Sequence, residues 1–414
     1  MVTSSHHESK LGLAKGSLGR HRVLVIGGGT AGICVAARLR NEGVDDVAII
    51  EPSRKHYYQP LWTLVGAGIV ANDETEREEA QYIPEGVRWI QDWAAEIDPK
   101  AQTVSLKTGG HVGYDFLVVA PGIQLDWDKI PGMREALSTP CVSTNYLFEY
   151  APKTWKVIQA FHGGNALFMH PTGPIKCAGA PQKIMYLAAD YFRKTGVLEK
   201  SHVIFASGGA AIFGVPEFRK VLEEVLVRYH IDGRFSHTLI EMRPEAREAV
   251  YSVPIDGGGT QKVVLQYDMA HVVPPQSAPD FVKKSPIANK DGWAKADKFT
   301  MQNPDYPNVF ALGDASELPT SRTGAAIRKQ APVLVHNLLA VMEGKALDAR
   351  YDGYASCPLV TSYDSLLLAE FDYDGKPAPS IPLIDTQKER YDMYLLKRYG
   401  LPWMYWNLML RGRA

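Results

Sequence analysis

Residues 22–32 read Arg22-Val23-Leu24-Val25-Ile26-Gly27-Gly28-Gly29-Thr30-Ala31-Gly32, a short apolar run that enters a glycine-rich turn. The run has the composition of a strand buried in a parallel sheet. An apolar helical pattern follows over residues 33–39, and a second apolar run over residues 47–50 ends at Glu51. This order of strand, glycine turn, helix and strand predicts a βαβ unit and therefore an α/β fold.

The glycines Gly27, Gly29 and Gly32 have the G-x-G-x-x-G spacing of a dinucleotide-binding turn. The first permits the tight turn, the second lets the backbone approach a pyrophosphate, and the third lets the helix pack closely on the strand. The pyrophosphate then lies at a helix N-terminus, where free N–H groups favour negative charge. Glu51 is placed to accept hydrogen bonds from ribose hydroxyls. The alternative is a close-packed turn that needs glycine for the fold alone.

A later apolar strand, residues 309–312, ends in Gly313-Asp314 and distinguishes FAD from NAD. It resembles the second FAD fingerprint of the glutathione-reductase-like flavoproteins, in which the aspartate holds the ribityl chain. The next residues can open a helix whose N-terminus faces the flavin: Thr323, Gly324, Ala325, Ala326 and Ile327. The positive end of a helix dipole there stabilises the anionic reduced flavin. A plain strand-end turn is the alternative for Gly313-Asp314.

Between these two FAD fingerprints lies a second α/β pattern, in which a helical span over residues 181–193 separates two strand-like runs. We therefore predict two Rossmann-like dinucleotide-binding domains in tandem, the second inserted in the first. The expected boundaries are a disordered lead-in over residues 1–20, an FAD-binding domain over residues 21–150 and 285–360, the second domain over residues 151–284, and a C-terminal segment over residues 361–414.

The glycines of the second domain do not form a nucleotide-binding turn. Gly208, Gly209 and Gly214 lack the G-x-G-x-x-G spacing. Bulky Ile212 and Phe213 stand where a pyrophosphate would need small residues. We therefore expect no nicotinamide site in this domain, so that a smaller reductant must reach the flavin directly.

Composition excludes several classes of protein. The chain has 414 residues, 45% hydrophobic and 22% charged, with a formal net charge of −1, so no global field attracts nucleic acid. It has four cysteines and no CxxC pair, so neither a disulfide-rich scaffold nor a zinc or other metal site is expected. The first twenty residues lack the apolar core of a signal peptide, and no uncharged apolar run reaches the length of about 18 residues that a spanning helix needs.

The four cysteines differ in their sequence context. Cys177 precedes a predicted helix that starts near Pro181, and Lys176 is a positive neighbour, so a nucleophilic thiolate is expected there. Cys357 lies in a turn-like context that by itself does not decide between a functional and a structural role. Cys34 follows the glycine turn and is expected in the core, and Cys141 is interpreted as structural.

Four longer stretches are more specific than the glycine turn. They are Glu51-Pro52-Ser53 with His56-Tyr57-Tyr58-Gln59-Pro60-Leu61-Trp62-Thr63-Leu64-Val65-Gly66-Ala67-Gly68, then Lys176-Cys177-Ala178-Gly179-Ala180-Pro181-Gln182-Lys183, then Ser356-Cys357-Pro358-Leu359-Val360-Thr361, and finally Trp406-Asn407-Leu408-Met409-Leu410-Arg411-Gly412. Through them the chain resembles, from about residue 21 to residue 412, the sulfide:quinone oxidoreductases of the type related to the mitochondrial enzyme.

The resemblance implies that Cys177 and Cys357 form a redox pair near FAD. Sulfide would attack their disulfide, or a sulfur-bridged form of it, at Cys357, which would carry the persulfide while Cys177 leaves as a thiolate. A small sulfur acceptor (sulfite, glutathione, coenzyme A or sulfide) would remove the sulfur, and a membrane quinone would take the electrons from FAD. A role for Cys141 as a third sulfur in the relay is left open.

The FAD contacts that the resemblance implies are Gly29, Thr30, Glu51, Gln59, Asp314, the helix start Gly324 to Ile327, and the backbone of Ala94 and Ala120.

Residues 386–414 combine basic and aromatic side chains and carry a net charge of about +4. The basic residues are Lys388, Arg390, Lys397, Arg398, Arg411 and Arg413, and the aromatic ones are Tyr391, Tyr394, Tyr399, Trp403, Tyr405 and Trp406. This pattern predicts an amphipathic segment in the headgroup region of a membrane, on the cytoplasmic face of the inner membrane in a bacterium. Pro402 is expected to divide it into a helix–turn–helix. Packing on the protein's own core, or on a second subunit in a homodimer, is the alternative.

Three other functions remain to be weighed. A type II NADH:quinone oxidoreductase would share the flavin domain and the quinone but need an intact second glycine turn. A flavocytochrome-type sulfide dehydrogenase subunit would use the same cysteines, reduce a haem partner and normally carry an export signal. A non-catalytic flavin scaffold or redox sensor is the third alternative, which the completeness of the flavin contacts and the two loop cysteines disfavour.

Overall fold

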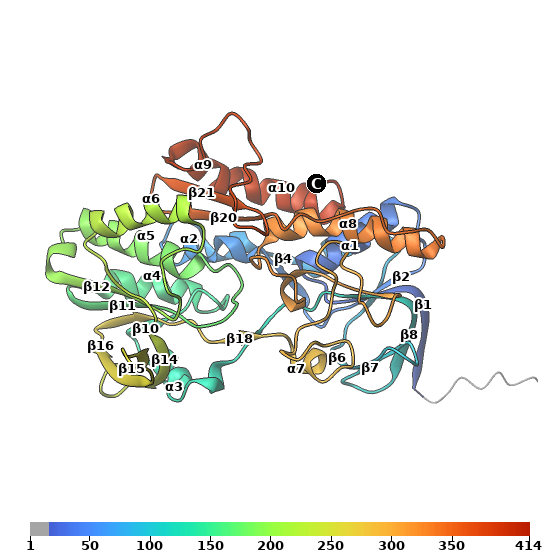
Figure 1. Ribbon diagram of the computed structural model, residues 1–414, viewed down its shortest axis with the longest axis horizontal. Helices are drawn as coiled ribbons and strands as arrows, with labels where there is room; N and C mark the ends of the chain where they lie inside the picture. Colours follow the sequence, from blue (N-terminus) through green and yellow to red (C-terminus); the bar gives the residue numbers. More distant parts are fainter. Residues whose placement is uncertain (1–15) are drawn as a thin grey trace, which may run out of the picture.

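The computed structural model describes residues 16–414 (Figure 1). A seven-stranded sheet has the strand order β5-β2-β1-β8-β7-β6, and the seventh strand, β19, pairs with β8. These strands are β1 (Ser17–Ile26), β2 (Val47–Ile50), β5 (Arg88–Ile90), β6 (Ala94–Asp98), β7 (Thr103–Leu106), β8 (His111–Val119) and β19 (Val309–Ala311). Five strands run parallel, namely β5, β2, β1, β8 and β19. Strands β6 and β7 form an antiparallel hairpin beside β8.

The apolar run that follows Arg22 forms the centre of this sheet. Val23 lies opposite Val47 on one side and Phe116 on the other, and the side chains of residues 23–26 are buried. A strand buried on both faces has the continuous apolar sequence that this run shows. Helices α1 (Thr30–Asn41) and α8 (Gly324–Met342) pack against each other over the sheet, and the core is formed between these layers.

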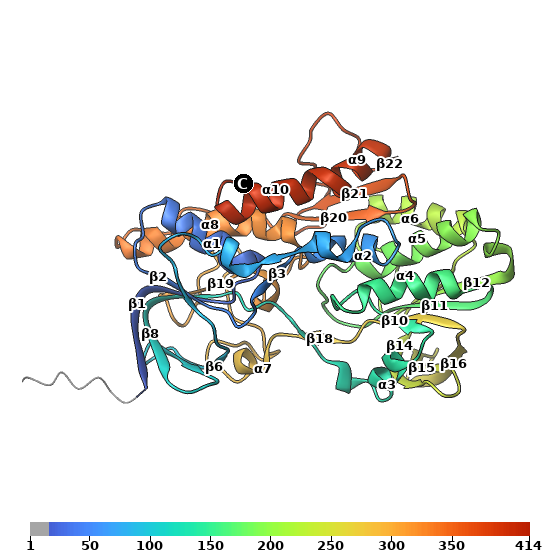
Figure 2. The same cartoon turned by 180° about the vertical axis from the view of Figure 1, so that it is seen from behind.

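A second sheet lies at the opposite end of the molecule (Figures 1 and 2). Its five strands are parallel, in the order β10 (Val142–Ser143), β17 (Met269–His271), β11 (Gly164–His170), β12 (Ser201–Ser207) and β13 (Asp232–Arg234). The helices of this region are α3 (Met133–Ser138), α4 (Ala151–Ala160), α5 (Ala180–Lys194) and α6 (Pro216–Arg228). A three-stranded antiparallel sheet follows α6 and β13: β14 (Thr238–Arg243), β15 (Glu248–Pro254) and β16 (Thr260–Gln266).

The observed elements shift three of the expected boundaries. Strand β1 begins at Ser17, inside the expected lead-in, because its first residues pair with β8; residues 1–15 lie outside the described part of the chain. Strand β10 starts before residue 151, because Val142 pairs with Ala270 in the second sheet. The two ends of the second region lie side by side, since β9 (Gln124–Leu125) pairs with β18 (Gln276–Ser277).

The third shifted boundary is the one expected at residue 360, which falls at the end of a strand. Cys357 lies in this strand and not in a turn. A C-terminal antiparallel sheet contains β20 (Ala355–Val360), β21 (Leu366–Phe371) and β22 (Glu389–Arg390), and it crosses the expected boundary at residue 360. The sequence context suggested a turn, but β20 is an edge strand, where Pro358, which has no N–H group, is tolerated.

The C-terminal segment is a continuous helical path and not the expected helix–turn–helix. Helix α9 (Tyr391–Leu395) passes through a π-helical turn (Leu396–Gly400) into α10 (Leu401–Asn407), and a 3₁₀ turn (Met409–Arg411) follows. Pro402 lies in the first turn of α10, and the wider π turn before it accommodates the proline without breaking the path. Among residues 16–414, the longest helices are too short or too polar to cross a bilayer.

Candidate active site

A cavity of about 380 Å³ lies between the seven-stranded sheet, α5, β20 and the C-terminal segment. The expected site residues that line it are Gly29, Thr30, Glu51, Gln59, Ala120, Cys177, Asp314, Gly324, Ala325 and Ile327. Gly27, Gly32, Gly313 and Ala326 lie in the same turns and helix starts without lining this cavity. Ala94 lies on β6 and does not line it either, so its expected contact gains no support from the cavity.

The three glycines of the turn meet different surroundings. Gly27 has a φ of +100°, and a Cβ atom there would collide with the backbone of Ala120. A Cβ atom on Gly32 would collide with the carbonyl oxygen of Gly27, so this glycine lets α1 pack against the turn. Gly29 faces open space in the cavity, with no atom within 4 Å of a Cβ position. The backbone at the start of α1 is therefore accessible to a pyrophosphate.

Glu51 is held at the end of β2 by two backbone groups. Its carboxylate accepts a hydrogen bond of 2.7 Å from the N–H of Gly28 and another of 2.7 Å from the N–H of Ser53. Burial nevertheless raises the pKa of this carboxyl group above its usual value. Such a group, lining the cavity, is suited to accept hydrogen bonds from ribose hydroxyls.

A buried chain of polar groups connects the C-terminal segment to the glycine turn. His56 Nδ1 lies 2.9 Å from Glu79 Oε2, His56 Nε2 lies 2.6 Å from the hydroxyl of Tyr405, and this hydroxyl lies 2.8 Å from Thr30 Oγ1. With Nδ1–H donating to the carboxylate, the Tyr405 hydroxyl donates to Nε2 and accepts from Thr30. Helix α10 thus contributes Tyr405 to the wall of the cavity beside the pyrophosphate position, a role that the sequence pattern did not reveal.

The other end of the cavity lies at the start of α8. A helix opens here as expected, and Thr323 caps it, since its hydroxyl accepts a hydrogen bond of 3.2 Å from the N–H of Ala326. A Cβ atom on Gly324 would meet open space, so the helix N-terminus faces the cavity. Asp314 lines the cavity nearby, and burial raises its pKa. One continuous cavity therefore joins a pyrophosphate position, a ribose acceptor, Asp314 and a helix N-terminus, which fits an extended dinucleotide such as FAD.

Cys177 and Cys357 come together beside this cavity although they are 180 residues apart. Both are free thiols; Cys177 lines the cavity, whereas Cys357 is fully buried behind it. Cys177 has a φ of +48°, an uncommon conformation that turns the chain into α5. The other two cysteines lie elsewhere: Cys34 on α1 donates to the carbonyl of Met409 (3.3 Å), and Cys141 lies 3.7 Å from Thr139 Oγ1.

The two sulfur atoms have opposite electrostatic environments. A hydrogen bond from the Cys357 thiol is the main cause that lowers the pKa of Cys177 well below its usual value, and the ammonium groups of Lys183 and Lys397 add to it. Lys183 Nζ lies 3.2 Å from Cys177 Sγ. The same pairing, together with burial, raises the pKa of Cys357. Cys177 is therefore the thiolate of the pair and Cys357 the thiol.

The lysines around the pair differ from the sequence expectation. Lys176 donates to Gln59 Oε1 (2.7 Å) and is not among the causes of the low Cys177 pKa. Lys397, expected at a membrane surface, is buried and donates to the carbonyl of Pro60 (2.8 Å). Burial lowers the pKa of Lys397 to about 7. The sequence could not identify Lys183 and Lys397, because only the packing of α5 and the π turn brings them to Cys177.

The turn after β12 is filled by its own side chains. Ile212 and Phe213 are buried, and the Phe213 ring packs on Phe218 and Phe371 with centroid distances of 6.3 and 5.8 Å. The carbonyl of Ile212 accepts a hydrogen bond of 3.1 Å from Gln182. The turn is therefore closely packed around Ile212 and Phe213, at positions where a nucleotide-binding turn has small residues.

One face of the C-terminal segment is exposed and aromatic. The exposed fractions of Tyr391, Tyr399 and Trp403 are about 60%, and Leu383 in the preceding loop is almost fully exposed. On the opposite face, Tyr405, Trp406, Met409 and Leu410 are buried against the core. Part of the expected basic surface is neutralised within the chain, because Arg398 pairs with Glu74 at 3.0 Å. The segment thus has both a core-packed face and a free apolar face.

Comparisons with known proteins agree with this geometry. A family model described as pyridine nucleotide-disulphide oxidoreductase matches residues 21–158. The mitochondrial sulfide:quinone oxidoreductase of Mus musculus is 46% identical, over 95% of this chain and 87% of the relative, and that of Dictyostelium discoideum is 43% identical, over 95% and 86%. The X-ray structure of the sulfide:quinone oxidoreductase of Aquifex aeolicus shares the fold, with a TM-score of 0.77 at 21% identity, over 95% of this chain and 92% of that one. Because the identity to the first two relatives extends along nearly the whole chain, the protein belongs to the sulfide:quinone oxidoreductase family of FAD-dependent flavoproteins.

Proposed function

We propose that this chain oxidises sulfide at the Cys177–Cys357 pair and passes the electrons through FAD to a membrane quinone. The position of Lys183, whose Nζ lies 3.2 Å from Cys177 Sγ at the cavity wall, carries this proposal. Thiol–disulfide exchange is faster when the leaving sulfur has the lower pKa, and the ammonium groups of Lys183 and Lys397 lower the pKa of Cys177, so an attack on the oxidised pair expels Cys177 and leaves the incoming sulfur on Cys357.

In this step hydrosulfide forms a new S–S bond at Cys357 Sγ as the S–S bond between the cysteines breaks. The electron pair of the broken bond goes to Cys177, so one anion, hydrosulfide, is replaced by another, the Cys177 thiolate. Lys183 and Lys397 stabilise that thiolate at the cavity wall. In a sulfur-bridged form of the pair, the same attack at Cys357 Sγ would break the bond to the bridging sulfur and expel Cys177 as a persulfide anion. A small sulfur nucleophile then takes the sulfane sulfur from Cys357.

The FAD-binding residues would be those of the first region, with the pyrophosphate at Gly29 and Thr30, a ribose at Glu51 and the ribityl chain at Asp314. Gln59, Ala120 and the start of α8 complete the surroundings of the flavin end. Bound FAD would accept two electrons, which restores the oxidised pair, and its reduced form would donate them to the quinone. The second Rossmann-like domain would hold no nucleotide, because Ile212 and Phe213 fill its turn. This filled turn disfavours a type II NADH:quinone oxidoreductase.

Quinone access is proposed through the C-terminal segment, docked peripherally on a membrane. The exposed aromatic face of α9 and α10 would lie in the headgroup region, where aromatic rings are favoured. The segment also borders the cavity, since Leu396, Lys397, Leu401, Met404 and Tyr405 line it. A quinone leaving the bilayer would therefore have a short path to the flavin.

The proposal is tested by mixing the FAD-loaded protein anaerobically with sulfide and following the flavin absorbance, then adding a short-chain quinone. We expect bleaching by sulfide and reoxidation by the quinone, with both lost in Cys177→Ser and in Cys357→Ser. Cys141→Ser is the matched control and should behave as the wild type. Bleaching by NADH but not by sulfide, or full turnover in both active-site variants, would refute the proposal.

A further inference from the structure

The two cysteines lie on two elements that touch at one end. Helix α5 starts just after Cys177 and carries Lys183, and strand β20 carries Cys357. A Cβ atom on Gly179, at the start of α5, would lie 2.5 Å from Leu359 Cδ2 and 3.7 Å from the Cβ atom of Cys357. Because Gly179 has no side chain, the helix start can approach the strand this closely.

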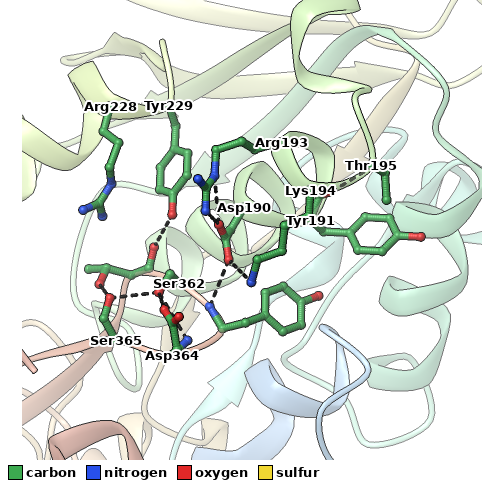
Figure 3. A network of polar contacts seen from close by, with 12 residues as sticks. Asp190, Tyr191, Arg193, Lys194, Thr195, Arg228, Tyr229, Ser362, Asp364 and Ser365 are labelled. Atoms are coloured by element: carbon green, nitrogen blue, oxygen red, sulfur yellow. Dashed lines mark hydrogen bonds and ion pairs between the residues drawn. The ribbon is translucent and has the colours of Figure 1, made fainter. Parts of the chain in front are cut away.

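At its other end, α5 is tied to the chain that follows β20 by the network of Figure 3. Asp190 has no exposed surface, and its Oδ2 atom accepts a hydrogen bond of 3.1 Å from the N–H of Tyr363. Lys194 (2.9 Å) and Arg193 (2.7 Å) pair with the same carboxylate from the solvent side. The two cations and the backbone N–H favour the ionised form, so the pKa of Asp190 is lowered although burial opposes this.

Helix α6 and strand β22 reinforce this attachment. The hydroxyl of Tyr229 donates to the carbonyl of Thr361 (3.0 Å). Arg228 forms two hydrogen bonds of 2.8 Å with Glu389, and Ser365 donates to the same carboxylate at 3.2 Å. The turn between β20 and β21 is therefore held by side chains from two helices of the second region.

Helix α5 thus makes two well-separated contacts, one with Leu359 on β20 and one with Tyr363, just beyond the end of β20. From residue 179 to residue 190 the helix rises about 16 Å. From residue 359 to residue 363 an extended chain spans at most about 13 Å. A second attachment this far from the first restricts the rotation of β20 on α5 that would move Cys357 relative to Cys177, in addition to the pairing of β20 with β21.

We propose that Asp190 is a positioning residue: by holding the N–H of Tyr363 it fixes β20 on α5 and thereby sets the distance between the sulfur atoms of Cys177 and Cys357. Neither sulfur touches Asp190, so its effect is transmitted through the helix and the strand. The inference rests on the redox role proposed for the pair. Without this anchor the end of β20 is held less firmly on α5, although its pairing with β21 remains, and the two sulfur atoms spend less time within bonding distance.

The test measures how fast the two thiols close into a disulfide in the FAD-loaded protein without sulfide. Diamide takes two electrons and two protons from the thiols as the S–S bond forms. The reaction is stopped with an alkylating agent, and the Cys177–Cys357 peptide is quantified by mass spectrometry. We expect Asp190→Ala to close about tenfold more slowly than the wild type, because proximity sets the rate of such intramolecular reactions.

Two further variants separate positioning from general stability. Asp190→Asn keeps an oxygen for the N–H of Tyr363 and should restore closure, whereas Arg193→Ala removes only a solvent-side cation and should leave closure unchanged. The pH midpoint of Cys177 alkylation should rise in Asp190→Ala alone, because the hydrogen bond from Cys357 is weakened. Should Asp190→Ala not fold, Tyr229→Phe carries the test with an expected slowing of about threefold.

Closure at the wild-type rate in Asp190→Ala, or in Tyr229→Phe if that variant carries the test, would overturn the proposal. Closure as slow in Asp190→Asn as in Asp190→Ala would also overturn it, since charge and not the anchoring hydrogen bond would then be responsible. A protein that shows the expected closure rates but whose FAD is not reduced by sulfide would refute the proposed function and leave the positioning role intact.

Discussion

At the scale of single residues, the active site depends on an asymmetry between two identical side chains. Cys177 receives a hydrogen bond from Cys357 and lies 3.2 Å from Lys183 Nζ, whereas Cys357 is buried in a strand. Lys183 therefore has a direct effect on the leaving group of the proposed reaction. Lys176 is adjacent in sequence, but its ammonium group binds Gln59.

Lys183→Gln should raise the pKa of Cys177 by about one unit or more, because a cation within hydrogen-bonding distance of a thiolate lowers its pKa by about that amount. The measurement is the pH dependence of alkylation of Cys177, followed by peptide mass spectrometry. Lys176→Gln is the matched control and should leave this pKa unchanged. A larger effect of Lys176→Gln than of Lys183→Gln would show that the wrong lysine has been assigned.

Lys397 should make this stabilisation dependent on pH. Its pKa is about 7, because burial disfavours the ammonium form, so it is charged at pH 6 and largely neutral at pH 8.5. Its support of the Cys177 thiolate is present below pH 7 and is lost as the pH rises through that value. Lys397→Met should therefore slow the alkylation of Cys177 at pH 6 and have little effect at pH 8.5. Arg398→Met serves as the control, and an unchanged rate at pH 6 in Lys397→Met would contradict the assignment.

At the scale of elements, local patterns predicted what local forces decide. The apolar run, the glycine turn and α1 follow one another in sequence, and their interactions are short-range, so both bounds of β2 and the start of α8 at Gly324 could be predicted. Cys357 was expected in a turn-like context, whereas pairing with β21 makes the segment a strand. The turn expected at Pro402 was wrong for a related reason, since a π turn absorbs the proline.

The C-terminal helices should support FAD binding as well as membrane docking. Tyr405→Phe removes the hydroxyl that joins Thr30 to His56 and leaves buried partners unsatisfied. We expect a loss of about 1–3 kcal/mol in the free energy of unfolding of the FAD-loaded protein, together with faster release of FAD. Urea titration measures the free energy of unfolding, and flavin fluorescence followed over time measures the release of FAD. Tyr399→Phe, at an exposed position on the same segment, should change neither value.

At the scale of the whole molecule, the seven-stranded sheet, helix α5, strand β20 and the C-terminal segment meet around one cavity. The sequence indicated FAD and a second domain without a nucleotide-binding glycine turn, and the family resemblance indicated the cysteine pair. It could not indicate that Lys183, Lys397 and Tyr405 surround the same cavity, because these contacts join residues up to 375 positions apart. Long-range packing of this kind leaves no periodic signal in a single sequence.

The exposed aromatic face should bind membranes independently of catalysis. A triple variant, Tyr391→Ser, Tyr399→Ser and Trp403→Ser, should lose most of its co-sedimentation with anionic phospholipid vesicles, because interfacial aromatic rings supply the apolar contact. Reduction of its FAD by sulfide and reoxidation by a water-soluble quinone should be unchanged. Val264→Ser, an exposed apolar position on β16, is the control and should bind vesicles normally. Undiminished vesicle binding of the triple variant would place the membrane surface elsewhere.

The most direct measurement of the central claim is the position of the first sulfur atom added to the protein. The oxidised, FAD-loaded enzyme is mixed anaerobically with one equivalent of sulfide, trapped within its first turnover by an alkylating agent, and mapped by peptide mass spectrometry. We predict one additional sulfur on Cys357, with Cys177 alkylated as the released thiolate. A persulfide on Cys177 or Cys141, with Cys357 unmodified, would contradict the proposed division of roles between the two cysteines.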